Sequence, residues 1–191
     1  MNKIVYLVAA GLISCQAFAL EITSDVNGPV TLVEPQLNMG ALAPKIALVD
    51  AKFKPQDVGG VNGKVQIIST IESFDTEVCD IQTMKFDEAA KKLPDVEISV
   101  ISANLPFIID NFQNKHKVKG IKLLSSFNNE EFGKQYGVQV VGGELKGILA
   151  RSVFVVDKKG RVIYKEITSN IDKMPNLDAA ISAARNASEN T

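Results

Sequence analysis

The chain has 191 residues, of which 46% are hydrophobic and 23% charged, a composition that excludes a disordered or low-complexity protein. Its 21 basic and 22 acidic residues leave a net charge of −1, too small a field to hold nucleic acid or an anionic membrane surface. One histidine and two distant cysteines cannot form a zinc site of nitrogen and sulfur ligands or a C-x-x-C dithiol, and we expect no metal and no cofactor.

Residues 1–19 have the pattern of a secretory signal peptide. The ten residues after Lys3 are apolar or glycine, a run too short to cross a bilayer, which needs about 20. Ala17-Phe18-Ala19 is a small-x-small cleavage pattern, so residues 20–191 would form one mature, exported domain. In a rival interpretation, Leu12-Ile13-Ser14-Cys15 is a lipobox, and the chain is anchored by an acylated Cys15.

Within that domain, strands and helices are predicted to alternate. In chain order, the first elements are two short strands over 21–32 about Asn27-Gly28, a short strand over 46–49, a glycine-rich loop over 57–62, a buried strand over 64–71 and a helix over 77–92. The later elements are a strand over 96–102, a helix over 106–112, a strand over 121–124, a helix over 129–136, a hairpin of 153–156 with 162–167, and a helix from the cap Asn176 to 184. This order predicts an α/β fold, in which a central mixed sheet is flanked by helices and preceded by an N-terminal β-hairpin.

Cys79, the one cysteine of the mature domain, lies at the start of the predicted helix over 77–92. The free N–H groups and the positive end of the helix dipole favour an anion there, so the thiol tends towards the thiolate, which attacks electrophiles. Thr76 lies three residues earlier, where its hydroxyl can reach the sulfur or a substrate. Position alone leaves open a buried cysteine that only fills the core.

The segment Ser73-Phe74-Asp75-Thr76-Glu77-Val78-Cys79 resembles the peroxidatic loop of the bacterial thiol peroxidases, a branch of the peroxiredoxins, which typically reads P-S-I-D-T-x-V-C. Other segments resemble the same family in the same order. They are 28–32, Ala43-Pro44, Ser102-Ala103-Asn104-Leu105-Pro106-Phe107, the stretch from Phe127 to Val138 and the stretch from Leu145 to Val153. The resemblance runs from about Asp25 to Ala184, and the order and spacing of the segments carry it.

This resemblance implies a thioredoxin-like (peroxiredoxin) fold and the reduction of hydrogen peroxide and organic hydroperoxides in antioxidant defence. By position, Cys79 would be the peroxidatic nucleophile, and Thr76 would hydrogen-bond the peroxide. Arg151, directly before an apolar strand, would stabilise both thiolate and peroxide. The implied partners are a hydroperoxide, an external thiol reductant (a thioredoxin-like protein or a small thiol) and a second copy of the chain in a homodimer. With the signal peptide, the expected location is the bacterial periplasm.

Two positions depart from the family pattern. The proline that opens the family's loop is Glu72 here, and its carboxylate would disfavour the thiolate if it points inwards, or cost mainly rigidity if it points outwards. In two-cysteine members the resolving cysteine follows a phenylalanine shortly after L-P-F, whereas here Phe112 is followed by Gln113. We therefore expect a single-cysteine peroxidase, whose oxidised Cys79 is returned by an outside thiol.

Two other classes of function remain open on the sequence. One is a non-catalytic binding or chaperone-like module, which Glu72 and the missing resolving cysteine favour. The other is a redox sensor that passes its oxidised state to a partner. The retention of Thr76, Cys79 and Arg151 together favours the enzyme, because packing alone does not require these three residues.

Overall fold

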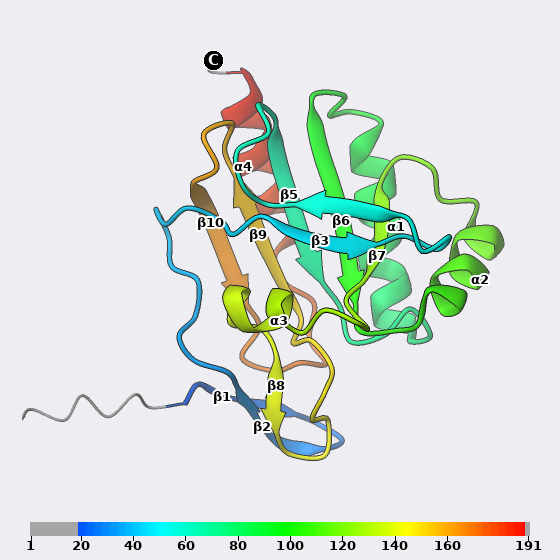
Figure 1. Ribbon diagram of the computed structural model, residues 1–191, viewed down its shortest axis with the longest axis vertical. Coiled ribbons are helices and arrows are strands. Elements are labelled where there is room, and N and C mark those ends of the chain that lie inside the picture. Colours follow the sequence, from blue (N-terminus) through cyan, green and yellow to red (C-terminus); the bar gives the residue numbers. More distant parts are fainter. Residues whose placement is uncertain (1–18, 190–191) are drawn as a thin grey trace, which may run out of the picture.

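The computed structural model describes residues 19–189, which form two β-sheets and four helices (Figure 1). The larger sheet has the strand order β10-β9-β5-β6-β7-β3-β4. Its strands are β3 (Ile46–Val49), β4 (Pro55–Val58), β5 (Val65–Thr70), β6 (Val96–Ser102), β7 (Lys122–Ser125), β9 (Ser152–Val156) and β10 (Val162–Ile167). The smaller sheet, at one end of the molecule, consists of β1 (Glu21–Ser24), β2 (Gly28–Leu32) and β8 (Val140–Gly142).

The larger sheet is mixed, as predicted. β5, β6 and β7 run parallel, and β9 and β3 flank them as antiparallel neighbours. Parallel neighbours need a long crossover, which α1 (Glu77–Ala90) provides between β5 and β6 and α2 (Pro106–His116) provides between β6 and β7. The central strands β5, β6 and β9 are buried along almost their whole length because both of their faces are covered.

Helices cover both faces of this sheet. Adjacent residues of β5 point into opposite cores: Ile67 packs in the core that α1, α2 and α4 (Leu177–Glu189) share, and Ile68 packs in the core beneath α3 (Glu131–Tyr136). Figure 1 shows α3 in front of the sheet, α1 and α4 behind it, and α2 at the right of the view. Within residues 19–189, no helix combines the length and apolar character needed to cross a membrane.

Both predicted hairpins are confirmed. β1 pairs antiparallel with β2, and Gly28 supplies the positive φ of 72° at their turn. β9 pairs antiparallel with β10 beyond the turn at Gly160, whose φ is 79°. The predicted cap of the last helix is also present, since Oδ1 of Asn176 accepts the N–H of Ala179 at 3.0 Å.

Several predicted boundaries differ from the structure by two or more residues. Residues 57 and 58, expected to begin a loop over 57–62, are the last two residues of β4. The helix expected to end at residue 112, α2, continues to His116. α2 stops there because Lys117 adopts the left-handed conformation, with φ 56°. α4 likewise continues past residue 184 to Glu189. The signal peptide predicted over 1–19 lies, except for Ala19, outside the described residues, as does Cys15.

Sheet topology brings the predicted site residues to one end of the molecule. Thr70, the last residue of β5, is the register partner of Ser152, the first residue of β9. The hydroxyl of Thr70 also donates to the carbonyl of Ala150 at 2.6 Å. Arg151 is therefore fixed beside the turn that leads from β5 to Cys79, although the two residues are far apart in sequence.

Candidate active site

Cys79 is the third residue of α1, and its side chain is fully buried. Thr76 caps the helix with an extended backbone (φ −114°, ψ 144°), and its carbonyl accepts the N–H of Asp80 at 3.0 Å. The N–H groups of a helix's first turn have no acceptor within the helix, so the sulfur lies where an anion is stabilised. Within residues 19–189, Cys79 is the free cysteine.

The Arg151 guanidinium lies beside this sulfur and is only 1% exposed. Its Nη2 donates to Sγ of Cys79 at 3.3 Å and to Oε1 of Glu72 at 2.9 Å. Its Nη1 donates to Oε1 of Gln82 and its Nε to the carbonyl oxygen of Ile171, both at 2.9 Å. A guanidinium is a cation with several fixed donors, so this contact can stabilise negative charge at the sulfur.

Gln82 was not identified from the sequence, where a polar residue in a helix suggests a solvent-facing side chain. It is fully buried one turn after Cys79 on the same face of α1. Its Nε2 donates to the hydroxyl of Ser69 at 2.7 Å, which turns Oε1 towards Arg151. The i, i+3 spacing from Cys79 was the only signal that could have indicated this role.

Thr76 is the one predicted site residue that the structure does not bring into contact with the other two. It is exposed, and its hydroxyl donates to the carbonyl oxygen of Ser73 at 3.4 Å. Within residues 19–189, the side chain makes no hydrogen bond to Cys79 or Arg151. A bond of 3.4 Å is weak, so little holds the hydroxyl in this orientation.

Asn104 holds the loop that carries Thr76. Its Oδ1 accepts the N–H of Phe74 at 2.8 Å, and its Nδ2 donates to the hydroxyl of Ser73 at 3.0 Å. The hydroxyl of Ser102 fixes Asn104 in turn, at 2.9 Å. The segment that follows β6 therefore positions the segment that follows β5, because the carboxyl ends of these parallel strands lie side by side.

Glu72 points inwards. Its side chain is 15% exposed and forms an ion pair with Arg151. Burial raises the pKa of Glu72 above its ordinary value, Arg151 acts in the opposite direction, and Asp172 adds to the increase. The sequence left open whether Glu72 points inwards or outwards. In the structure it points inwards, and its carboxyl group lies beside the same Arg151 guanidinium that contacts Cys79.

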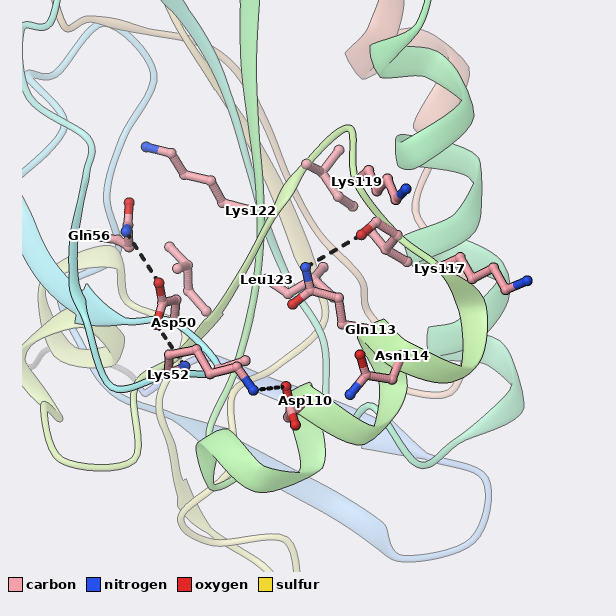
Figure 2. A pocket seen from close by; sticks show the side chains of 14 residues that line it. Asp50, Lys52, Gln56, Asp110, Gln113, Asn114, Lys117, Lys119, Lys122 and Leu123 are labelled. Atoms are coloured by element: carbon pink, nitrogen blue, oxygen red, sulfur yellow. Dashed lines mark hydrogen bonds and ion pairs between the residues drawn. The ribbon is translucent and has the colours of Figure 1, made fainter.

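Gln113, at the position of the family's resolving cysteine, faces a different part of the molecule. Its Nε2 donates to the carbonyl oxygen of Val118 at 3.4 Å (Figure 2). It lines a pocket of about 550 Å³ beside α2, where Lys52 pairs with Asp110 at 2.7 Å. Cys79, Thr76 and Arg151 do not line this pocket, so it is separate from the thiol site.

Comparisons with known proteins agree with this geometry. Residues 38–181 match the Redoxin family. The thiol peroxidase of Aquifex aeolicus is 38% identical over 164 residues, covering 85% of this chain and 96% of that protein, and the thiol peroxidase of Bacillus subtilis is 40% identical over 159 residues, covering 83% and 93%.

A solved structure confirms the predicted thioredoxin-like peroxiredoxin fold. The crystal structure of a peroxiredoxin-like protein from Aquifex aeolicus superposes with a TM-score of 0.83 at 35% identity, covering 87% of this chain and 96% of that one. The family match spans well over half of the chain, and the identities to the two thiol peroxidases extend over most of it. The chain therefore belongs to the bacterial thiol peroxidases, within the peroxiredoxin superfamily.

Proposed function

We propose that this thiol-dependent peroxidase reduces hydrogen peroxide and organic hydroperoxides through one cysteine, Cys79. The observation that supports this assignment is the 3.3 Å contact between Arg151 Nη2 and Cys79 Sγ. Both side chains are almost completely buried, so the positive charge acts with little screening by water. A fixed cation in such a site stabilises charge without reorganising during the reaction.

In the proposed reaction, the Cys79 thiolate attacks one peroxide oxygen, and the O–O bond breaks as the S–O bond forms. Sulfur becomes a sulfenic acid, and the other oxygen leaves with the bonding electrons and takes up a proton as water or an alcohol. Arg151 stabilises the thiolate before attack and the leaving oxygen during it. Thr76 would hydrogen-bond the peroxide after its hydroxyl turns from the Ser73 carbonyl, a weak contact of 3.4 Å.

An outside thiol would complete the cycle. It condenses with the sulfenic acid, releasing water and leaving a mixed disulfide, and a second thiol then frees Cys79. This reductant is a thioredoxin-like protein or a small thiol, because Gln113 carries no sulfur with which to form an internal disulfide. The family resemblance also supports a homodimer. Sedimentation velocity of the mature chain would measure the mass of this dimer.

We expect peroxide to oxidise the mature chain without forming a disulfide. In the absence of reductant, the sulfenic acid on Cys79 persists until a trapping agent captures it, or excess peroxide converts it to sulfinic acid. Intact mass spectrometry of the alkylated, unreduced protein should therefore show a monomer with added oxygens. With sulfenic-acid trapping, one adduct per chain should map to Cys79.

A dominant disulfide-linked dimer in that experiment would contradict the single-cysteine scheme and place the resolving step between two subunits. Absence of both oxygen addition and adduct would instead favour a non-catalytic binding module. A matched reaction on the Cys79→Ser variant controls for methionine oxidation, which also adds oxygen to the intact mass.

Export to the bacterial periplasm is the second part of the proposal, and it rests on residues 1–19. We expect mass spectrometry of the protein isolated from its native cells to find Leu20 as the first residue. An acylated Cys15 would identify the lipoprotein alternative, which is also exported. An intact Met1 on a protein in the cytoplasmic fraction would contradict both forms.

A further inference from the structure

One nitrogen of Arg151 serves two acidic groups. An Nη nitrogen carries two hydrogens, and those of Nη2 point to Oε1 of Glu72 at 2.9 Å and to Sγ of Cys79 at 3.3 Å. The carboxyl group and the sulfur are thus held next to each other across a single NH₂ group. A peroxide that reaches the sulfur is therefore within reach of the carboxyl group.

The charges in this site do not balance if both groups are ionised. A Glu72 carboxylate and a Cys79 thiolate would place two negative charges around one buried guanidinium. Asp172, the other charged group that acts on Glu72, is also acidic. Uncompensated charge away from water is costly, so ionisation of one group favours protonation of the other. The raised pKa of Glu72, caused first by its burial, agrees with this coupling.

We propose that Glu72 is the general acid of this peroxidase: it keeps the proton displaced from the Cys79 thiol and gives it to the leaving oxygen. This proposal rests on the proposed function of Cys79 and adds a catalytic residue to it. The reacting state contains a Glu72 carboxylic acid, a Cys79 thiolate and the Arg151 cation.

The proton transfer balances the reaction. As sulfur takes the hydroxyl oxygen of the peroxide, the other oxygen leaves with the electron pair of the broken O–O bond and accepts the Glu72 proton. Water or an alcohol is released, Cys79 becomes a neutral sulfenic acid, and the Glu72 carboxylate pairs with Arg151. The three side chains carry one positive and one negative charge before and after the step. The proton returns to the site when the external thiol restores Cys79.

Two oxidants distinguish the two possible roles of Glu72, a general acid and a residue that only holds Arg151 in place. Hydrogen peroxide expels hydroxide, a strong base that needs a proton, whereas peracetic acid expels acetate, which is stable without one. Loss of a general acid therefore slows the first oxidant selectively. Loss of an anchor displaces Arg151 and changes both rates together.

The test is single-turnover oxidation of Cys79 by hydrogen peroxide and by peracetic acid, in wild type and Glu72→Gln. Glutamine keeps an oxygen to accept from Arg151 but has no proton to exchange. We expect the ratio of the peracetic acid rate to the hydrogen peroxide rate to rise on the order of 10²-fold in the variant. A ratio that stays at the wild-type value would overturn the proposal and leave Glu72 as an anchor of Arg151.

Glu97→Gln is the matched control, because Glu97 also forms a partly buried ion pair, with Lys122 at 2.8 Å, near the opposite end of β6. It should keep both rates and their ratio, and a ratio that rose as much as in Glu72→Gln would also overturn the proposal. If Cys79 of the wild-type protein reacted with neither oxidant, the peroxidase function of Cys79 would be refuted. The role of Glu72 as its general acid would then be refuted too. Thermal unfolding of each variant verifies that the protein compared is folded.

Discussion

Cys79→Ser should reduce peroxide consumption in the presence of dithiothreitol to the uncatalysed rate. A serine hydroxyl does not ionise near neutral pH, so the Arg151 charge beside it cannot produce an anionic nucleophile. Since enzymes typically exceed the uncatalysed rate by about 10⁶-fold or more, the loss should be the largest of any single substitution in this chain. The fold should persist, because serine differs from cysteine by one atom in a fully buried position.

The control is the same substitution at the other cysteine of the sequence. Cys15→Ser should keep full turnover, since Cys15 lies in the segment predicted to be removed or acylated. Turnover retained by Cys79→Ser would mean that the peroxidase reaction does not use a thiol of the mature domain. Turnover lost in both variants would point to a role for Cys15 in the purified protein.

Arg151→Met should lower peroxide turnover on the order of 10²-fold or more. Methionine is long and apolar and can fill the buried space, but it removes the charge that contacts Sγ at 3.3 Å. The measurement is the initial rate of hydrogen peroxide consumption at saturating dithiothreitol. Because Gln82 and Glu72 also lose their donor, the unfolding temperature should fall, and rates should be compared well below it.

Two further variants test whether turnover depends on the charge of Arg151 or only on the volume that its side chain fills. Arg151→Lys keeps the charge but offers one nitrogen in place of the guanidinium fork, so we expect partial activity between wild type and Arg151→Met. Arg161→Met removes an exposed arginine, which donates to the Gly40 carbonyl at 2.9 Å, and should leave turnover unchanged. An Arg151→Met variant with wild-type turnover would show that this residue only fills the core.

Sequence patterns predicted the elements whose apolar runs or caps are local, and missed those that depend on distant partners. β5 and β6 are rich in valine and isoleucine and lie almost where they were expected. β8 has three residues and exists because Thr31 of β2 pairs with Gly142 more than a hundred positions later. β4 begins with proline and contains an acidic residue, which is unusual for a strand, and it is tolerated at the edge of the sheet.

The site residues also differ in whether a local sequence pattern could predict them. The position of Cys79 at a helix start is local, and the sequence indicated it directly. Arg151 could be assigned only through the family resemblance, because its approach to the sulfur follows from the antiparallel pairing of β5 with β9. The inward orientation of Glu72 has no local signal, and Gln82 has only its i, i+3 spacing from Cys79, because the position of both side chains depends on where the guanidinium lies.

The four partners of the Arg151 side chain come from segments that only the folded chain brings together: the turn after β5, two positions in α1, and the loop after β10. We expect such long-range pairings to form late in folding, because the entropy of closing the loops between them is lost before they contribute stability. In a newly made chain, we therefore expect the Cys79 sulfhydryl to lack its contact with Arg151 until folding is complete. Folding of the protein and activation of its sulfur should then be the same event, so that an unfolded chain reacts with peroxide more slowly than the folded molecule.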